Sequence, residues 1–272
     1  MLDPVTAALR AHGFELTAPQ SPAREHLTRL IQDAASDNDL VIVMGGDGSI
    51  NGALPGIMQS KLPVGIIPAG TANDLARTLG LPTDVIACVD VIASGRLREI
   101  DVARVNGTPF INAASIGISV DITRQLDKPF KKRWGKLAYV LAASRALFRM
   151  RAFTADVIFE NDRTKTRSVQ IVVGNGRYFG TGMTVDAEAS IDDGVLHLYS
   201  INAAPWWRLL TLLPILRAGT HAKSTHVVNV TDTQITINTH RPRTITADGE
   251  IISQTPGRFE VTSKAIRVFV PE

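Results

Sequence analysis

Residues 40–80 read LVIVMGGDGSINGALPGIMQSKLPVGIIPAGTANDLARTLG, and this stretch decides the fold. It contains two apolar runs, residues 40–44 and 64–67, and each run leads directly into a polar turn that contains glycines. Short apolar runs bounded by glycine predict buried strands, and the residues after each turn predict a helix. An alternation of strand and helix favours a parallel sheet in an α/β domain, in which both turns lie at the carboxyl edge.

The two turns have the composition of an anion-binding site. Glycine permits positive φ and a close approach of the backbone to a ligand, and backbone N–H groups at a helix start face negative charge. The residues concerned are Gly45, Gly46, Asp47, Gly48, Ser49, Ile50, Asn51 and Gly52 around the first turn, and Gly70, Thr71, Asn73 and Asp74 around the second. We predict that these residues bind a nucleotide, with its phosphates in the crevice between the turns.

The pattern on either side of this stretch predicts two domains. Before residue 100 we expect helices at residues 4–11, 21–34, 71–79 and 83–94, a short strand at residues 14–17, and a helix after Asp47 that is weak or broken. After residue 100 we expect a hairpin with an Asn106-Gly107 turn, helices at residues 134–150 and 204–217, and strands at residues 153–159, 168–173, 195–200, 225–230, 234–238, 244–247, 258–262 and 265–270. The predicted fold is a doubly wound α/β domain with a parallel sheet (residues 1–103), followed by an antiparallel, sandwich-like β domain (residues 104–272) whose last segment returns to the first domain.

The composition narrows the class of protein. The chain has 272 residues, 44% of them hydrophobic and 20% charged, and a formal net charge of +3, which is too small to indicate a nucleic-acid partner. The single cysteine, Cys88, excludes a disulfide framework and fits a reducing cytoplasm. No run approaches the about 20 apolar residues that cross a bilayer, and the N-terminus lacks the features of a signal peptide. We therefore expect a cytoplasmic protein.

One basic cluster suggests a membrane surface as a partner. Its members are Lys128, Lys131, Lys132, Arg133 and Lys136, interleaved with Phe130 and Trp134. Basic residues with aromatic neighbours dock on anionic lipid headgroups, and Trp206-Trp207 before an apolar helix suits a membrane interface. A solvated face for the cluster and core packing for the tryptophans are the alternatives, and both stay open. Under the first interpretation the protein is peripheral to the inner face of the membrane.

The paired turns, GGDGS at residues 45–49 and PAGTAND at residues 68–74, resemble the diacylglycerol kinase catalytic domain family, which includes soluble bacterial diacylglycerol kinases, sphingosine kinases and ceramide kinases. The first motif alone is shared with NAD kinases and phosphofructokinases, whereas the pair at this spacing is far more specific. Further matches are Asp101 and residues 112–117, 174–176, 193–194 and 248–250. The resemblance implies an NAD kinase-like α/β domain, a β-rich lipid domain, and transfer of the γ-phosphoryl group of ATP to the hydroxyl of diacylglycerol or a related lipid, with Mg²⁺.

The resemblance also implies catalytic roles. Glu250 matches the family's proposed general base, and Asp248 is the second candidate. On one extended strand the two side chains would point the same way and raise each other's pKa. Asp47 would act through a metal or a metal-bound water, in a network with Asp101. Thr17 resembles the family's threonine on the adenosine side.

A second, structural magnesium is implied at residues 190–195. Its ligands would be the side chain of Asp193 and the backbone carbonyls of Ser190 and Val195, an oxygen-only set that suits Mg²⁺. From the residues alone, both Asp193-Gly194 and Asp248-Gly249 are also typical of ordinary hairpin turns.

The sequence departs from the family pattern in two places. Gly52 stands where the family usually has glutamate, and the family's first strand, which ends in Asn-Pro-x-x-Gly, is absent from the sequence. An upstream start, a fragment and the loss of part of the ATP site are the three explanations. The alternatives to a lipid kinase are therefore a catalytically impaired nucleotide- or lipid-binding relative and a kinase of a soluble substrate such as NAD. The sequence does not identify the lipid, and it is silent on whether a homodimer forms.

Overall fold

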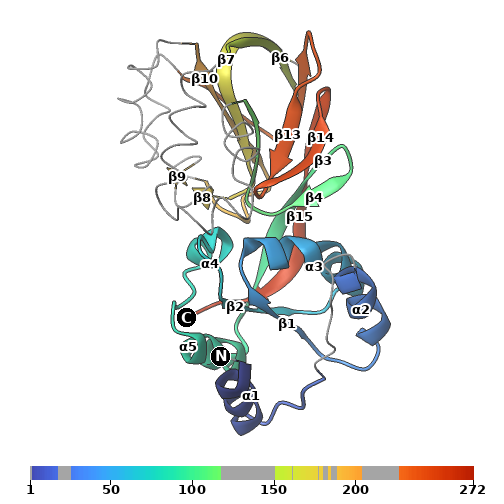
Figure 1. Ribbon diagram of the computed structural model, residues 1–272, viewed down its shortest axis with the longest axis vertical. Helices are drawn as coiled ribbons and strands as arrows, with labels where there is room; N and C mark the ends of the chain where they lie inside the picture. Colours follow the sequence, from blue (N-terminus) through green and yellow to red (C-terminus); the bar gives the residue numbers. More distant parts are fainter. Residues whose placement is uncertain are drawn as a thin grey trace, which may run out of the picture.

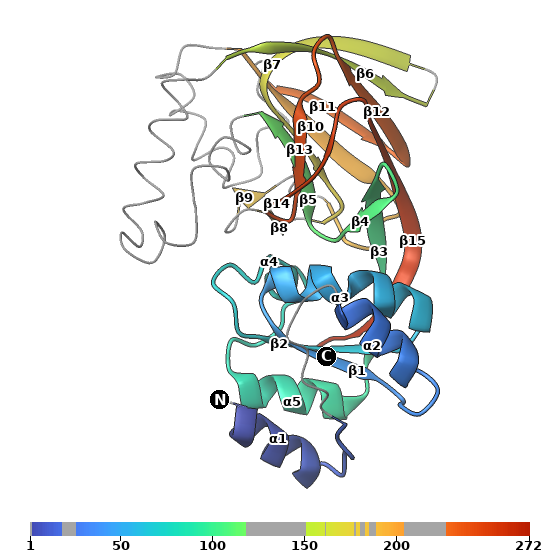
Figure 2. The ribbon, with the colours of Figure 1, turned by 45° about the vertical axis from the view of Figure 1, so that its right-hand side comes forward.

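The computed structural model describes residues 2–17, 26–117, 151–160, 162–176, 178–179, 183–184, 189–203 and 227–272. Figure 1 shows two domains stacked along the long axis, a helix-containing domain that holds both ends of the chain and a β-rich domain above it. The strands β3 and β15 run between the two domains, as the turned view in Figure 2 also shows.

The α/β domain contains seven described elements before β3. They are α1 (Leu2–Ala11), α2 (Leu27–Ala34), β1 (Val41–Gly45), α3 (Asp47–Ser60), β2 (Val64–Pro68), α4 (Asp74–Thr78) and α5 (Val85–Ser94). The remaining elements are β3 (Leu97–Val105), β4 (Thr108–Phe110), β5 (Ala113–Gly117), β6 (Phe153–Phe159), β7 (Asp162–Gly174), β8 (Tyr178–Phe179), β9 (Met183–Thr184), β10 (Leu196–Asn202), β11 (Val227–Asp232), β12 (Gln234–Thr239), β13 (Thr244–Ala247), β14 (Glu250–Gln254) and β15 (Gly257–Phe269).

The sheet of the α/β domain is mixed. β1 and β2 are parallel, and the end of β15 lies parallel to β2 through the pair Val268 and Val64. β15 is in turn antiparallel to β3. The predicted α/β class is confirmed, but the sheet is not wholly parallel. The last strand of the chain occupies the place beside β2 and brings the antiparallel β3 with it.

Helices cover both faces of this sheet, which is why every residue of β2 is buried. On one face Val5 and Leu9 of α1 pack with Cys88, Val89 and Ile92 of α5. On the other face α2 and α3 pack against the strands. Cys88 is fully buried, and burial raises the pKa of its thiol to about 11, so it is a core residue.

The expectation of a weak helix after Asp47 is wrong, because α3 runs unbroken for 14 residues through Pro55. Its buried stripe, formed by Ile50, Leu54 and Ile57, outweighs the low helix propensity of glycine and proline. Gly56 has a packing role. A Cβ there would lie 2.9 Å from the Cα of Thr28, so the glycine lets α2 approach α3 closely.

The β domain confirms most of the predicted strands. β6 and β13 have the predicted bounds, and the hairpin of β3 and β4 turns at Asn106-Gly107, where both residues have positive φ. Its core is one cluster that includes Phe110, Ile171 and Phe259. All described strand pairs among β5, β6, β7, β10, β11, β12, β13 and β14 are antiparallel.

Four expectations about individual elements are corrected. Residues 14–17 form no strand, and α4 begins at Asp74 rather than at residue 71. The two strands predicted at residues 258–262 and 265–270 are one strand, β15, with a register shift between Thr262 and Ile266. β14 (Glu250–Gln254) was not among the predicted strands, although Asp248-Gly249 is typical of the hairpin turn that precedes it.

The predicted helices at residues 134–150 and 204–217, the basic cluster and Trp206-Trp207 lie outside the described residues. The start of the helix expected at Ser21-Pro22 also lies outside them, and its described part is α2. Among the residues that the structure describes, no helix is long and apolar enough to span a bilayer.

Candidate active site

The two glycine turns meet backbone to backbone at the ends of β1 and β2. Gly45 and Pro68 are register partners, and the N–H of Ala69 donates to the carbonyl of Gly45 at 2.9 Å. A Cβ on Gly70 would lie 2.5 Å from the Cα of Gly46. Only glycine fits at such a contact, so the two turns adjoin at the carboxyl ends of β1 and β2, as predicted. We call this junction of the two turns the crevice.

Asn73 closes the second turn. Its side chain accepts a hydrogen bond from the N–H of Gly70 at 3.0 Å and donates to the carbonyl of Gly70 at 3.1 Å. Its φ of 49° is a left-handed conformation that asparagine tolerates better than most residues. Ala69, Gly70 and Thr71 stay exposed at the mouth of the crevice, where a ligand can reach them.

Asp47 links the two turns. Its carboxylate accepts the N–H groups of Asp74 and Leu75, each at 3.1 Å, and so caps the start of α4 from a different helix. The first turn is also closed internally, because the N–H groups of Ser49 and Ile50 donate to the carbonyl of Gly46. Those two N–H groups are therefore used within the turn, and the binding of phosphate by the residues of this turn stays a prediction.

Asn112 joins the crevice to the β domain. It is 4% exposed, and its side-chain amide lies 3.4 Å from Asp47 Oδ1, while its backbone N–H donates to Asp248 Oδ1 at 3.0 Å. Its own Oδ1 is buried and has no hydrogen-bond partner among the described residues. The backbone N–H of Asn175 holds the carbonyl of Asn112 at 2.9 Å.

Asp248 holds the backbone between β4 and β5 in place by hydrogen bonds. Its carboxylate accepts the N–H groups of Ile111, Asn112 and Ala113 at 2.8, 3.0 and 3.2 Å. Burial raises its pKa to about 6, and the nearby charge of Asp47 acts in the same direction, although the three N–H groups oppose both. Asp47 and Asp248 are therefore close enough to repel one another across the domain boundary.

The hairpin of β13 and β14 does not hold Glu250 in the predicted geometry relative to Asp248. Asp248 and Gly249 form a two-residue turn with φ values of 47° and 82°, and Glu250 pairs with Ala247. Asp248 and Glu250 thus do not lie on one extended strand, and the expectation that their side chains point the same way is wrong. Glu250 is the first residue of β14 and is partly buried, and it follows Asp248 by two positions in the sequence.

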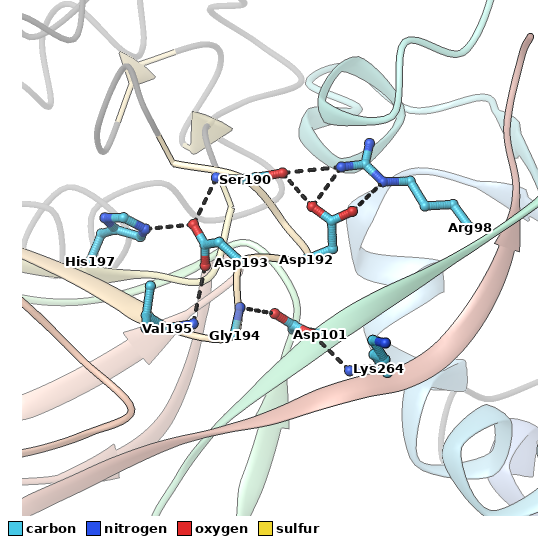
Figure 3. A network of polar contacts seen from close by, with 9 residues as sticks. All are labelled: Arg98, Asp101, Ser190, Asp192, Asp193, Gly194, Val195, His197 and Lys264. Carbon is cyan, nitrogen blue, oxygen red and sulfur yellow. Dashed lines mark hydrogen bonds and ion pairs between the residues drawn. The ribbon is translucent and has the colours of Figure 1, made fainter.

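Asp101 is not brought into contact with Asp47. Its Oδ2 accepts the N–H of Gly194 at 2.7 Å, and its Oδ1 accepts the N–H of Lys264 at 2.7 Å (Figure 3). Lys264 lies where β15 changes register between the domains. The described contacts of Asp101 therefore support a structural role at the domain junction rather than the predicted shared network.

The turn of residues 190–197 surrounds Asp193 with hydrogen-bond donors (Figure 3). The N–H groups of Ser190 and Val195 donate to its carboxylate at 2.9 and 3.1 Å, and His197 Nε2 lies 2.8 Å from Asp193 Oδ2. Burial by itself raises the pKa of Asp193, but these hydrogen bonds outweigh it and the pKa is lowered. No group of three or more histidine, cysteine, aspartate or glutamate side chains suited to a metal occurs among the described residues.

The other residues that were predicted to bind the nucleotide differ in their surroundings. Thr17 and Thr71 are exposed, the side chain of Ile50 is in the core, and Asn51 Oδ1 is buried without a described partner. Gly48 and Gly52 lie in the first turns of α3. Sequence reasoning gave no role to Asn112 and Asn175. The available signal was that both residues lie in segments that resemble the family, residues 112–117 and 174–176.

These features define a class of protein, in which an α/β domain with paired glycine turns is joined to a β-sandwich-like domain. The β domain brings the carboxylate of Asp248 close to Asp47. Family profiles match both parts, the diacylglycerol kinase catalytic domain over residues 1–105 and the YegS C-terminal NAD kinase beta sandwich-like domain over residues 112–270. The chain belongs to this diacylglycerol kinase family of lipid kinases.

Individual relatives agree with the assignment. The chain is 26% identical to the diacylglycerol kinase of Bacillus subtilis (strain 168), over 96% of this chain and 87% of that protein. It is 30% identical to a Klebsiella pneumoniae (strain 342) protein named "probable lipid kinase YegS-like", over 97% of this chain and 89% of that protein. A solved structure from Bacillus anthracis str. Sterne, provisionally named a diacylglycerol kinase, has a TM-score of 0.86 at 25% identity and covers 99% of this chain and 90% of its own.

Proposed function

We propose that this protein is an ATP-dependent lipid kinase of phospholipid metabolism, which phosphorylates the hydroxyl of diacylglycerol or a related lipid. The observation that carries the proposal is the link from Asp47 in the glycine crevice, through Asn112, to Asp248 in the β13–β14 hairpin. Phosphoryl transfer needs the donor phosphate and the acceptor hydroxyl held in one geometry. A nucleotide crevice tied by hydrogen bonds to a hairpin of the second domain supplies that arrangement.

In this mechanism the phosphates of ATP lie at the mouth formed by Ala69, Gly70 and Thr71. The lipid hydroxyl approaches from the β domain, and Glu250 accepts its proton as general base. The hydroxyl oxygen forms a bond to the γ-phosphorus, the bond from that phosphorus to the β–γ bridging oxygen breaks, and ADP leaves. Asp248 holds the backbone of residues 111–113 and so positions the hairpin beside the crevice.

Magnesium would neutralise charge on the phosphates during transfer. The crevice fits such an ion, because Asp47 keeps lone pairs beyond its N–H donors and Asn112 Oδ1 is a buried oxygen without a described partner. Mg²⁺ is usually held by one or two carboxylates together with substrate phosphates and several waters. Asp47 would hold the ion through its water shell, and Asn112 would accept a hydrogen bond from one of those waters.

The membrane and the cytoplasm are the expected setting. The relatives' names include diacylglycerol kinase and lipid kinase, and a lipid substrate requires at least peripheral contact with a membrane. We propose that the protein associates peripherally with the inner face of the membrane, and that the basic cluster of residues 128–136 contributes to this association. Whether a homodimer forms is a separate question, on which the proposal does not depend.

Transfer of radiolabelled phosphate from ATP tests the proposal, with mixed micelles of diacylglycerol, sphingoid base or phosphatidylglycerol and with free NAD as acceptors. We expect labelled lipid, and for Glu250→Gln a fall in turnover of about 100-fold or more with ATP binding retained. Glu260→Gln is the matched control, because Glu260 is a half-exposed residue of β15 paired with Arg258.

Each outcome of this assay is decisive. Undiminished turnover of Glu250→Gln would refute the assignment of the base. Binding of ATP without transfer to any lipid would refute the kinase and favour the impaired relative. Transfer to NAD would favour the kinase of a soluble substrate.

A further inference from the structure

The backbone of residues 111–113 is held by two partners that lie far away in the sequence. Asp248 accepts all three N–H groups of this segment, and its own N–H donates to the carbonyl of the third residue at 3.0 Å. The carbonyls of Ile111 and Asn112 accept hydrogen bonds from Asn175 at 3.0 and 2.9 Å. Every backbone N–H and carbonyl of the segment is therefore used within the chain.

Asn175 also joins this segment to β3. It follows directly after β7 and is 1% exposed. Its side-chain amide donates to the carbonyl of Asp101 at 2.9 Å as well as to that of Ile111, while its backbone N–H serves Asn112. One residue thus connects the end of β7, β3 and residues 111–113 at the domain junction.

The identity of the residue follows from these contacts. An amide NH2 group has two donors, and Asn175 meets two carbonyls with it. Its Oδ1 is buried without a partner among the described residues, which costs stability. Proteins retain such costs mainly at functional sites, where the other contacts of the residue have a use.

The chain after Asn175 lies against the helix that starts at the crevice. A Cβ on Gly176 would lie 3.6 Å from Thr78 Cγ2 of α4, at an ordinary contact distance. The start of α4 is held by Asp47, which faces the side-chain amide of Asn112 at 3.4 Å. The end of β7 therefore meets the crevice both at α4 and through Asn112.

The position of the Asn112 side chain depends on its backbone. Its only described side-chain hydrogen bond is the one to Asp47, and 3.4 Å is long for such a bond. The amide is therefore placed mainly by the hydrogen bonds that hold residues 111–113. A displacement of about 1 Å in a positioning group can lower a reaction rate by about 100-fold.

We propose that Asn175 is a positioning residue of the active site, which holds the carbonyls of Ile111 and Asn112 and thereby fixes the Asn112 side chain at Asp47. Asn175 itself touches neither the nucleotide nor the lipid. This inference rests on the proposed kinase function, to which it adds a residue of the β domain. The hold on residues 111–113 can be measured without turnover, so the inference and the proposed function can fail separately.

Hydrogen-exchange mass spectrometry of the nucleotide-free protein tests the hold. Asn175→Ala removes both side-chain donors and is expected to speed exchange in the peptide that contains residues 111–113 by about 10-fold or more. Gly176→Ala is the matched control, because its new Cβ fits at ordinary contact distances, and it should exchange like wild type. Asn175→Ser keeps one hydroxyl donor, is expected to show an intermediate effect, and serves where Asn175→Ala does not fold.

Kinetics test the positioning role at a temperature where circular dichroism shows every variant to be folded. Asn175→Ala is expected to lower kcat for transfer from ATP to lipid by about 10- to 100-fold, with the KM for ATP changed by less than about 3-fold. Because Asn175 acts through Asn112, the same substitution in an Asn112→Ala background should lower kcat by less than about 3-fold. Gly176→Ala should keep the wild-type kcat.

Three results would overturn the inference. They are unchanged exchange of residues 111–113 in the Asn175 variants, an undiminished kcat in a folded Asn175→Ala protein, and an equal fall of kcat in the wild-type and Asn112→Ala backgrounds. If the wild-type protein transfers phosphate to no lipid, the proposed function fails. The exchange measurement then still decides whether Asn175 holds the segment.

Discussion

The crevice and the 190–197 turn hold their carboxylates in opposite ways. In the crevice Asp47 and Asp248 receive N–H groups and one amide and repel each other, and the pKa of Asp248 is raised to about 6. In the turn Asp192 and Asp193 face a guanidinium and an imidazole, and the pKa of each is lowered. Among the described residues, the carboxylates of the crevice thus have no basic side chain as a partner, whereas each carboxylate of the turn has one.

This difference has a physical meaning for the site. Charge left uncompensated at a functional site costs stability, and natural proteins retain it where a ligand supplies the compensation. A carboxylate with an internal partner stabilises the fold but is less able to accept a cation. The two regions can therefore be separated by substitutions that affect one kind of carboxylate and not the other.

The largest effect is expected from Gly70→Ala, which forces apart the two turns of the crevice. The new Cβ would overlap the backbone of Gly46, and backbone cannot move aside as a side chain does. We expect a loss of about 3 kcal/mol in the free energy of unfolding and a fall in nucleotide affinity of at least about 10-fold. Chemical denaturation and nucleotide titration measure these quantities.

Gly194→Ala provides the comparison in the turn. Gly194 has φ of 76° and its Cβ would lie 3.3 Å from Ser263 Oγ, so the substitution causes backbone strain with little overlap. We expect the free energy of unfolding to fall by about 1 kcal/mol and the nucleotide affinity to stay unchanged. If both alanine variants lose the same free energy of unfolding and both keep their nucleotide affinity, the contact of Gly70 with Gly46 is not what holds the crevice together.

A smaller effect is expected in the pH dependence of stability, with opposite sign in the two regions. Asp248 has a raised pKa, so its contribution is fully favourable below the ordinary aspartate pKa of about 3.9 and is lost as pH rises through about 6. Relative to wild type, the free energy of unfolding of Asp248→Asn should rise by about 2 kcal/mol between pH 4 and pH 7. This value is reduced because the side chain of Asp248 is partly exposed to solvent.

Asp193 has a lowered pKa, and its contribution is present above the ordinary aspartate pKa and lost as pH falls through the lowered one. Relative to wild type, Asp193→Asn should therefore become less stable as pH rises from 3 to 5. Urea denaturation at a series of pH values measures both differences. The same sign for the two variants would mean that the contrast between the regions is wrong.

The sequence predicted the parts of the crevice that depend on local pattern. The two glycine turns and the strands before them follow from residues 40–80, since short apolar runs and glycines act over a few residues. The bounds of β6 and β13 were likewise predicted, because β-branched and aromatic residues between turn signals decide them. The family resemblance supplied Glu250, which no local pattern distinguishes from a turn residue.

The contacts that give the carboxylates their different properties were beyond the sequence. Asp248 reaches the backbone of residues 111–113, which lie more than 130 positions earlier in the chain. Asp101 meets Gly194 and Lys264 for the same reason, since strands distant in sequence become neighbours only in the folded sheet. Even the contact of Asp193 with His197, four residues away, depends on the positive φ of Gly194 that redirects the chain.

The smallest effect is expected from Arg98→Gln, which removes the partner of Asp192. The two side chains are about one-third exposed, so water and salt screen the pair, but the guanidinium holds both carboxylate oxygens. We expect the free energy of unfolding to fall by about 1 kcal/mol at low salt. This difference from wild type becomes smaller as the NaCl concentration is raised, because screening weakens the wild-type ion pair.

Arg163→Gln is the control for this measurement, because Arg163 is 66% exposed and contacts Asp156 through a single nitrogen. Its expected effect is smaller than that of Arg98→Gln at every salt concentration, in denaturant titrations at 20 mM and 500 mM NaCl, roughly the range over which screening changes most. If Arg98→Gln costs no more than Arg163→Gln, the turn does not depend on its guanidinium. The stability of the turn would then come from the Asp193–His197 contact and the backbone N–H groups alone.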